Sequence, residues 1–323
     1  MRKQEHPRSF DVPFLTRQLI AYIGNKRRLL PFLAEIFEDH RRPVGVTEFV
    51  DPFAGSGAVA RLARLLGYRV AAADREEYAA VVCRAALTPT RWQADALLER
   101  FGGLERAIHA LNEIGSAAAN EKASPPGYIE RNYAPRTTED ADYRTERLFY
   151  TTENARFLDA VRDTVETWLP PLPSLGRSEE GWYEHARSDE GYPELARPEQ
   201  TWSEGSVLSD SAWGYSVARA LLIAPVLYEA SVHANTSGVF KAFHKGFGGH
   251  GRDALGRILA PARLEVPELI EGPSARVEQA DAADFCRGTS SDIVYLDPPY
   301  NQHQYGSNYF MLNTIARWDK PAV

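Results

Sequence analysis

The residues of this chain that point most directly to chemistry are Asp297-Pro298-Pro299-Tyr300, which follow the apolar, β-prone run Asp292–Leu296. That run predicts a buried strand, and the four residues predict a stiff loop, because proline fixes φ and donates no backbone N–H. The Asp297 carboxylate and the free carbonyls could accept hydrogen bonds, and the Tyr300 ring could stack on a planar group. Such a loop suits an exocyclic amine of a nucleobase held against an electrophile; the alternative is an ordinary strand-to-loop turn.

A glycine-rich loop lies near the N-terminus. The segment Phe49–Gly57 (FVDPFAGSG) begins in a predicted strand at 47–50 and precedes a predicted helix at 58–66, with Gly67 as its terminating residue. Gly55 and Gly57 permit positive φ and close backbone approach, and the following helix offers unpaired N–H groups. The spacing matches neither the dinucleotide-binding G-x-G-x-x-G nor a P-loop, so a plain strand–helix turn is the alternative.

Two acids end further predicted strands. Asp74 ends the strand predicted at 68–73, about 20 residues after the glycine loop, where an acid holds ribose hydroxyls in such folds; the alternative is an exposed acid or helix cap. Asp281 ends a β-like stretch at 275–281 and lies either over a cofactor pocket or at the surface beside Asp284.

One basic stretch precedes the first strand. Tyr22–Pro31 (YIGNKRRLLP) combines a Gly24-Asn25 turn with the consecutive cations 26–28, which by themselves predict a solvated helix face. The helix that follows is predicted to be amphipathic, with its apolar residues at Leu29, Leu30, Phe32, Leu33 and Ile36.

The order helix, strand, glycine loop, helix, strand, acid is typical of the start of a doubly wound α/β domain. Residues 85–270 are predicted to be mostly helical, with helices at 148–169 and 211–233 around a Pro-, Gly-, Ser- and Glu-rich surface segment at 170–210. The α/β pattern resumes near 275, so residues 1–84 and 271–323 are expected to share one sheet and 85–270 to be inserted between them.

Composition limits the class of protein. The chain has 323 residues, 44% hydrophobic and 25% charged, with a net charge of −7 and a pI near 5.7. That charge argues against nucleic-acid binding through bulk electrostatics, but a local basic cleft remains compatible with it. We expect no membrane span, no secretory signal and no metal site, and Cys83 and Cys286 indicate a reducing cytoplasm.

The motifs, in this order, resemble the Dam-like (D12 class) adenine-specific DNA methyltransferases in their α-type arrangement. Tyr22–Pro31, Phe49–Gly57 and Asp297–Tyr300 are similar to the N-terminal cofactor motif, the cofactor loop and the catalytic motif of that family. The resemblance covers about residues 20–80 and 275–318. It implies a Rossmann-like, S-adenosylmethionine-dependent methyltransferase sheet with an inserted, mostly helical target-recognition region, acting on N6 of an adenine flipped out of double-stranded DNA.

The resemblance also implies roles for individual residues. Asp297 and the Pro298 carbonyl would accept hydrogen bonds from N6, with Pro299 stiffening the loop and Tyr300 stacking on the base. The residues expected to surround the cofactor are Tyr22, Lys26, Asp51, Phe53, Gly55, Gly57, Asp74 and Asp281. Asp at position 297 favours adenine N6 as the target. Related enzymes that methylate cytosine N4 usually have Ser at this position, and those that methylate a glutamine side chain or an RNA base usually have Asn.

DNA contacts are expected from a loop that interleaves cations, aromatics and glycines at 238–252. Its candidate DNA-binding residues are Lys241, His244, Lys245 and Arg252. A second basic-aromatic stretch contains Tyr128, Arg131, Tyr133, Arg136, Arg144 and Arg147. For both stretches the alternative is a surface loop whose aromatics pack on the core.

The chain departs from the family after its catalytic motif. Dam-like catalytic domains continue with several strands and helices, whereas residues 304–323 suffice for one helix around 309–318. Three explanations stay open: a fragment of a longer protein, a second chain that completes the fold, or a decayed catalytic fold. Beside the methyltransferase we therefore keep a non-catalytic or split DNA-binding subunit of a restriction-modification or defence complex.

Overall fold

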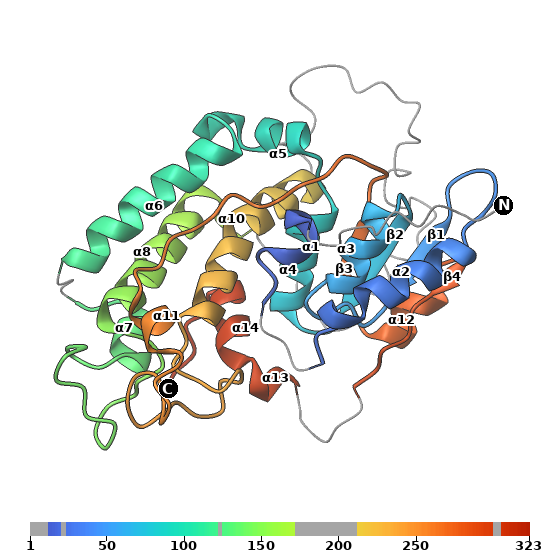
Figure 1. The fold of residues 1–323 in the computed structure, drawn as a ribbon. Coiled ribbons are helices and arrows are strands. Elements are labelled where there is room, and N and C mark those ends of the chain that lie inside the picture. Colours follow the sequence, from blue (N-terminus) through green and yellow to red (C-terminus); the bar gives the residue numbers. More distant parts are fainter. Residues whose placement is uncertain (1–11, 21–23, 122–124, 172–211, 300–304) are drawn as a thin grey trace.

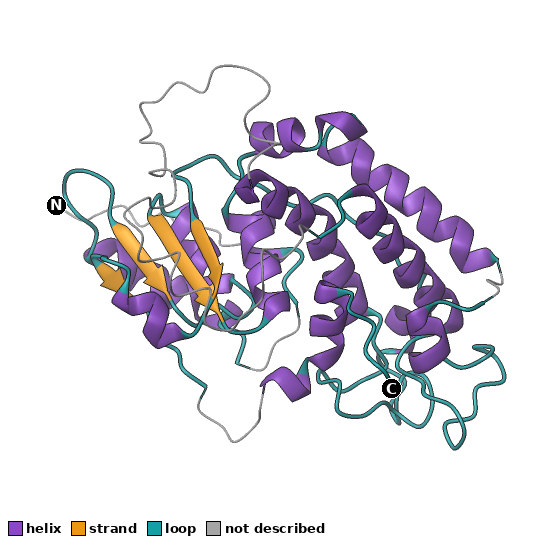
Figure 2. Ribbon diagram, turned by 180° about the vertical axis from the view of Figure 1, so that it is seen from behind, coloured by secondary structure: helices purple, strands orange, loops and turns teal. Residues whose placement is uncertain are grey.

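The computed structural model describes residues 12–20, 24–121, 125–171, 212–299 and 305–323 (Figure 1). A small sheet with its helices forms one side of the molecule and a group of longer helices forms the other (Figure 1, Figure 2). In chain order the elements are α1 (Pro13–Thr16), η1 (Arg27–Leu29), α2 (Leu30–Asp39), β1 (Glu48–Asp51), α3 (Ala58–Leu65), β2 (Arg69–Asp74), α4 (Glu77–Leu87), α5 (Arg91–Leu97), η2 (Glu99–Phe101), α6 (Leu104–Asn120), α7 (Tyr128–Tyr133), α8 (Thr152–Trp168), α10 (Ala212–Val232), α11 (Leu255–Leu259), β3 (Arg276–Gln279), α12 (Ala282–Arg287), β4 (Ile293–Val294), α13 (Tyr305–Asn308) and α14 (Phe310–Arg317).

The sheet has four parallel strands in the order β3-β2-β1-β4. The strands predicted at 47–50, 68–73 and 275–281 are confirmed, with ends shifted by one or two residues. The chain places β2 and then β3 on one side of β1 and returns to place β4 on the other. This is the strand order of the first part of a Rossmann-like sheet, and the point of return between β1 and β4 is where such folds bind ligands.

Alternating strand residues bury both faces of the sheet to different extents. On one face Phe49 of β1 packs against Phe37 of α2, with ring centroids 5.0 Å apart, and Tyr68 and Tyr295 extend this aromatic cluster. On the other face Val50 and Ala73 pack on Phe285 of α12. The first face therefore carries most of the core of this side of the molecule.

Two apolar features are more exposed than the sequence predicts. The run Asp292–Leu296 was expected to be a buried strand, but β4 has two residues, and Val294 and Leu296 are 48% and 64% exposed. The reason is that, within the described part of the chain, β4 pairs with β1 alone and is an edge strand. On α2 the helix is confirmed, but Phe32 faces outward at 60% exposure.

The helical side has its own core, in which α6, α8, α10 and α14 pack together. Helix α8 begins at Thr152, four residues later than predicted, because Thr151 is extended and its side chain accepts the Asn154 N–H. Helix α10 matches the prediction of 211–233 and is long and apolar enough to cross a membrane by length and composition, with 61% of that window buried inside the protein. Burial of that kind is typical of a core helix. The predicted surface segment lies, beyond 171, outside the described residues.

Residues 260–275 form an extended strap from the helical side to β3, visible as the long orange-brown trace in Figure 1. Asn112 pairs with both the N–H and the C=O of Leu264, at 2.8 and 2.9 Å. Further along, the buried Arg64 guanidinium donates to the carbonyls of Ile270 and Pro273. Side chains from the helical side and from the sheet side thus form hydrogen bonds with backbone groups of the strap that lie outside any helix or strand. These bonds hold the two sides of the molecule together.

Candidate active site

A pocket lies at the carboxyl ends of β1 and β4, at the point where the strand order reverses. It brings together three segments that are far apart in the sequence, 24–26, 51–59 and 295–297. Its lining residues are Gly24, Asn25, Lys26, Asp51, Phe53, Ala54, Gly55, Ser56, Ala58, Val59, Tyr295 and Asp297. Of the sequence-predicted site residues, Lys26, Asp51, Phe53, Gly55 and Asp297 therefore share one pocket.

The glycine loop turns because two of its residues adopt a left-handed backbone. Gly55 has a φ of 52° and Gly57 a φ of 77°, and Gly57 precedes α3 without a side-chain cap. A Cβ at Gly57 would lie 3.0 Å from the Cys83 Sγ. Glycine is therefore required at position 57 by both the backbone conformation and the space, and the first amides of α3 are left available.

Asp74 holds this loop from the end of β2. Its two carboxylate oxygens accept the N–H groups of Gly55 at 2.8 Å and Glu76 at 2.9 Å. Burial raises the pKa of Asp74, against the lowering effect of these hydrogen bonds. Asp281 is exposed, and its carboxylate accepts the Ala283 N–H at 2.9 Å as the N-cap of α12. Asp74 and Asp281 thus follow neighbouring strands, but neither lines the pocket described above.

Asp51 is the most deeply buried acid of the pocket, at 1% exposure. Burial, followed by the charges of Asp74 and Asp297, raises its pKa to about 7, although the Phe53 N–H 3.3 Å away opposes this shift. A buried acid poised near neutrality is a good partner for a cationic ligand, because the cation favours its ionised form.

Replacing Asp51 by asparagine removes this ionisation and keeps the shape. Because the folded-state pKa lies above the ordinary value of 3.8, the stability that Asp51 contributes is lost as the pH rises through 7. We expect the difference in Tm, Asp51→Asn minus wild type, to increase by about 5 °C between pH 5 and pH 8. Thermal unfolding without cofactor measures this difference. Asp159 is a second buried acid with a pKa of about 7, but it is present in both proteins, so its contribution to the pH dependence of Tm cancels in the difference. A Tm difference that does not change with pH would contradict the buried, neutral Asp51.

Lys26 is directed into the pocket rather than to solvent, contrary to the solvated-face alternative. Its Nζ lies 2.6 Å from Asp297 Oδ2 and donates to the Gly24 carbonyl at 2.8 Å. Gly24 has a φ of 82°, and Asn25 Oδ1 accepts the Arg27 N–H, so the predicted turn is confirmed. Arg27 and Arg28 remain exposed. The N-terminal motif thereby contributes one cation to the catalytic motif.

The rest of the catalytic motif is open to solvent where it is described. Pro298 and Pro299 are exposed beyond the end of β4. Tyr300, expected to stack on the base, and Tyr22, expected to close the pocket, lie outside the described residues.

Tyr295 is a pocket residue that the sequence analysis missed. It follows β4, its N–H donates to the Val50 carbonyl at 2.8 Å, and its ring packs beside Phe37. Burial and then the charges of Asp297 and Asp51 raise its pKa to about 12. The available signal was the period of two in an extended chain, which places residues 295 and 297 on the same side.

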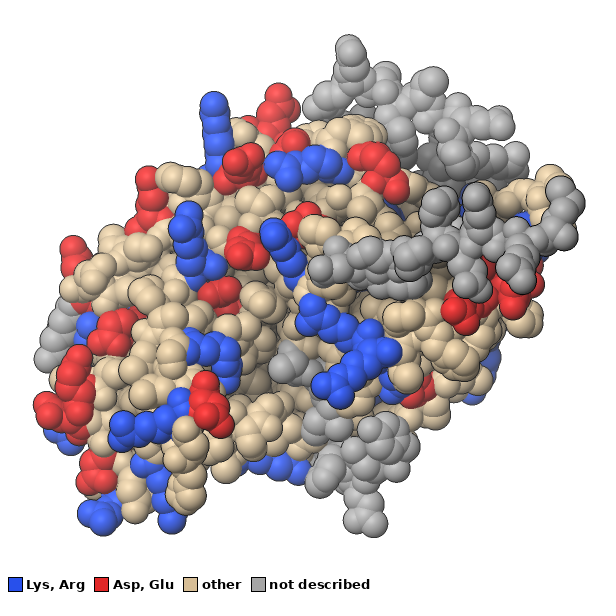
Figure 3. Space-filling view, in the orientation of Figure 1, with Lys and Arg blue, Asp and Glu red and all other residues tan. Residues whose placement is uncertain are grey.

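The loop at 238–252 exposes its cations and packs two of its aromatic rings inward. Lys241, Lys245 and Arg252 are exposed. Phe240 and Phe243 pack on Phe149, with ring centroids 6.5 and 5.1 Å away. Figure 3 shows Lys and Arg side chains, with a few acids among them, at the lower end of the helical side, where the loops beside α7 and α11 lie in Figure 1. The loop therefore combines the expected exposed charges with the alternative, core-packed placement of its aromatics.

The second basic-aromatic stretch divides in the same way. Tyr128 and Tyr133 were candidates for DNA contact, but they are buried, with ring centroids 5.9 Å apart, because α7 packs them into the helical core. Arg144 and Arg147 are exposed. Lys245 lies 5.7 Å from the Tyr143 ring, so the two stretches meet at the surface.

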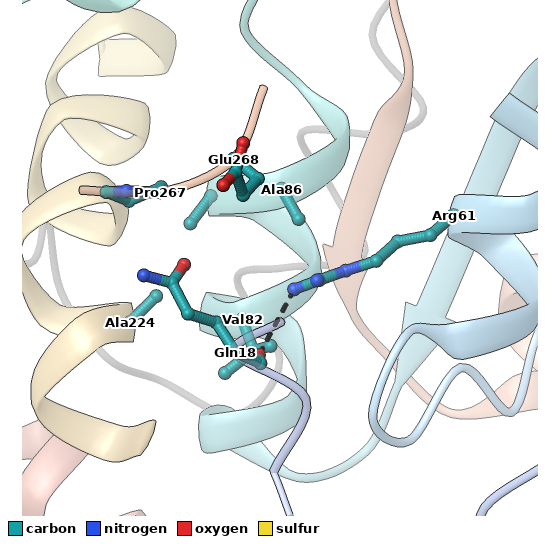
Figure 4. A pocket seen from close by; sticks show the side chains of 8 residues that line it. Gln18, Arg61, Val82, Ala86, Ala224, Pro267 and Glu268 are labelled. Atoms are coloured by element: carbon teal, nitrogen blue, oxygen red, sulfur yellow. Dashed lines mark hydrogen bonds between the residues drawn. The ribbon is translucent and has the colours of Figure 1, made fainter. Parts of the chain in front are cut away.

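A second hollow lies where α3, α4, α10 and the strap meet (Figure 4). Arg61 enters it from α3 and donates to the Gln18 carbonyl at 3.5 Å. Its lining residues are Gln18, Arg61, Val82, Ala85, Ala86, Ala224, Pro267 and Glu268. None of the sequence-predicted site residues is among them, and Arg61 also donates to the Phe14 and Arg17 carbonyls, which indicates a structural role.

A parallel sheet in this strand order, with a glycine turn after β1 and an Asp-Pro-Pro loop after β4, is the arrangement of a Rossmann-like methyltransferase. The chain belongs to the D12 class N6 adenine-specific DNA methyltransferase family, whose model matches residues 22–167 and 179–323. The resemblance noted in the sequence is thereby confirmed.

Curated relatives agree with this family. Modification methylase LlaI of Lactococcus lactis subsp. lactis is 27% identical over 304 residues, which are 94% of this chain and 39% of that protein. Type II methyltransferase M.NlaIII of Neisseria lactamica is 29% identical over 303 residues, which are 92% of this chain and 69% of that protein. Type II methyltransferase M.FokI of Planomicrobium okeanokoites is 23% identical, and the chain spans 37% of its length. No solved structure matches the chain.

Proposed function

We propose that this chain transfers a methyl group from S-adenosylmethionine to N6 of an adenine in double-stranded DNA. The observation that carries the proposal is the single pocket formed by Lys26, Asp51 and Asp297 at the return point of the sheet. Membership of the adenine-specific family supports the target atom, and the printed descriptions of the relatives support a role in restriction-modification. A protein of this kind would act in the cytoplasm.

The residues of the pocket fit this cofactor. Gly55 and Gly57 let the backbone approach a ligand, and the uncapped start of α3 favours its polar groups. Asp51, buried and poised near neutrality, would bind the ammonium of the methionine part, and Asp74, which holds the glycine loop through the Gly55 N–H, would also accept from ribose hydroxyls. When bound, S-adenosylmethionine supplies an electrophilic methyl group on a sulfonium sulfur.

The catalytic work of the chain is positioning. N6 is inaccessible in a stacked duplex, so the base must be flipped out before reaction. Asp297 and the Pro298 carbonyl would then accept the N6 hydrogens and aim the nitrogen lone pair at the methyl carbon. Lys26 binds Oδ2 of Asp297, which would leave Oδ1 to accept from N6. In the transfer, the new N6–C bond would replace the methyl–sulfur bond, with S-adenosylhomocysteine as the leaving group, and N6 would release one proton to solvent or to Asp297.

We assign target recognition to residues 85–270, with the exposed cations of the 238–252 loop binding phosphates. Lys241→Ala/Lys245→Ala is expected to weaken DNA binding and to lower the slope of log Kd against log salt by about 2, since each phosphate contact contributes about 0.9. Fluorescence anisotropy with a labelled duplex at several salt concentrations measures both. Arg91→Ala is the control, because α5 lies at the opposite end of the helical side (Figure 1). An unchanged slope in the double variant would show that Lys241 and Lys245 do not contact DNA phosphates.

The test of the proposed reaction is transfer of labelled methyl from S-adenosylmethionine to unmethylated genomic DNA, followed by nucleoside analysis. Label in N6-methyladenine supports the proposal. Label in N4-methylcytosine would show that the chain is a DNA methyltransferase with a different target atom.

A second candidate is a subunit that binds DNA and cofactor but does not complete the catalytic fold by itself. Its sheet would be completed by further polypeptide, either of the same protein or of a partner. The exposed Val294 of β4 and Leu296 just beyond it favour it, because among the described residues β4 pairs with β1 alone and unpaired apolar edges are ordinarily covered. The span of the relatives, of which this chain matches between 37% and 69%, is compatible with it. Binding of both S-adenosylhomocysteine and DNA without any methyl transfer would favour this candidate over the first.

A further inference from the structure

Helices α13 and α14 follow the catalytic motif and lie between the sheet side and the helical side (Figure 1). Most of α14 is buried against α4 and α10. Tyr309, between the two helices, is fully buried, with its ring centroid 5.4 Å from that of Tyr78 in α4. Helix α14 and Tyr309 are thus packed on α4, the helix that follows β2.

Asn313 of α14 connects these helices to the turn after β2. Its Nδ2 donates to Glu76 Oε2 at 2.5 Å, and its Oδ1 accepts the Tyr78 N–H at 3.3 Å. Asn313 is 8% exposed. A carboxylate on one side and a backbone N–H on the other require both a donor and an acceptor, which asparagine provides in one side chain.

Glu76 continues this connection to the glycine loop. Its own N–H donates to Asp74 Oδ1, and Asp74 Oδ2 accepts the Gly55 N–H. Helix α13 also contacts Glu76, since a Cβ placed on Gly306 would lie 3.3 Å from Glu76 Oε1. A series of hydrogen bonds therefore runs from α14 through Glu76 and Asp74 to the pocket residue Gly55.

The same helices hold the loop that carries the exposed cations. The Phe240 N–H donates to the Asn308 carbonyl at 2.7 Å, and Asn308 is 2% exposed. Phe310, at the start of α14, packs on Phe149, the ring that also supports Phe240. The 238–252 loop is thus bonded to α13, and the glycine loop is linked through Asp74 and Glu76 to Asn313 of α14.

We infer that Asn313 and Glu76 are positioning residues that couple DNA binding to cofactor binding. This inference rests on the proposed function. Movement of the 238–252 loop on DNA would be transmitted through α13 and α14 to Glu76, and from there to Asp74 and Gly55. Each ligand would then tighten the binding of the other, because both favour the same placement of these helices.

The test measures the Kd of S-adenosylhomocysteine by calorimetry, with and without saturating duplex that carries the sequence methylated in the transfer assay. For the wild type we expect the duplex to tighten this Kd about tenfold. Asn313→Asp keeps the acceptor for Tyr78 but sets a carboxylate against Glu76. We expect it to reduce the effect of the duplex to about twofold or less, with the Kd measured without DNA nearly unchanged.

Two further variants separate positioning from simple stability. Glu76→Gln keeps an acceptor for Asn313 and is expected to lose less coupling than Asn313→Asp. The double variant Asn313→Asp/Glu76→Gln restores a donor and an acceptor and should recover most of the coupling. Asn112→Asp is the matched control, because Asn112 pairs with Leu264 of the strap in the same two-way manner, away from this path. It should lower the Tm and leave the coupling intact.

The outcomes distinguish this inference from the function on which it rests. A wild type that binds both ligands without coupling, or an Asn313→Asp variant with full coupling, would overturn the inference and leave the methyltransferase proposal standing. A wild type that methylates no sequence and binds no S-adenosylhomocysteine would overturn both.

Discussion

Asp297→Ala is expected to lower the rate of methyl transfer about 1,000-fold, because in the proposed mechanism Asp297 is the acceptor that would orient N6. Asp297 lies in the pocket with Lys26 and Asp51, and its carboxylate is 2.6 Å from the Lys26 Nζ. The binding of S-adenosylhomocysteine should change by less than about threefold, since Asp51 and the glycine loop are intact. Single-turnover transfer assays and calorimetry measure the two effects separately.

Asp284→Ala provides the control for this experiment. Asp284 is an acid of the same part of the chain, on α12, where it pairs with Arg287 at the surface. The Asp284→Ala variant should transfer methyl groups at the wild-type rate. If Asp297→Ala instead lost cofactor binding and kept the transfer rate at saturating cofactor, Asp297 would be a cofactor ligand and the assignment of its role would be wrong.

Asp51→Ala is expected to weaken S-adenosylmethionine binding by about 10- to 100-fold, the cost of removing a charge-assisted hydrogen bond in a buried site. Asp51 is buried with a pKa of about 7, so binding a cation beside it should release a proton near neutral pH. Calorimetry in two buffers of different ionisation enthalpy detects that release in the wild type, and the variant should not show it.

Asp159→Ala is the matched control for Asp51. Asp159 is also buried with a pKa of about 7, but it accepts the Ile129 and Glu130 N–H groups at the start of α7. Its loss should lower the Tm and leave cofactor affinity unchanged below the unfolding temperature. Equal loss of affinity in both variants would mean that Asp51 supports the fold and does not contact the cofactor.

The sequence predicted the parts of the site that follow directly from strand ends. Asp51 and Asp297 each follow an apolar run, and parallel strands bring such positions to one edge of a sheet. The turn at Gly24-Asn25 was also readable, because a glycine and an asparagine tolerate its backbone. The ion pair between Lys26 and Asp297 could not be predicted, because the two residues are more than 250 positions apart and no local pattern indicates their pairing.

Other features could not be predicted because they depend on what covers a surface. The apolar run before Asp297 indicates a strand, but its burial depends on neighbours on both faces, and Val294 is half exposed on an edge. In the same way Tyr128 and Tyr133 sit among cations in the sequence and within the helical core in space. The pairing of Asn313 with Glu76 joins residues 237 positions apart and has no signal in either segment.

The base of the 238–252 loop is closed by one residue. Asn235 is fully buried, its carbonyl and side chain accept the N–H groups of His244 and Gly248, and its side-chain amide donates to the Leu148 carbonyl. Within this closed loop Phe240 and Phe243 pack on Phe149, whereas Lys241, Ala242 and Lys245 are exposed. The exposed positions can therefore change while the packed rings, the stem and the pocket keep their places. If the loop binds DNA as proposed, exchanges at those few positions would be the simplest way for a lineage to acquire a new target sequence and keep its chemistry.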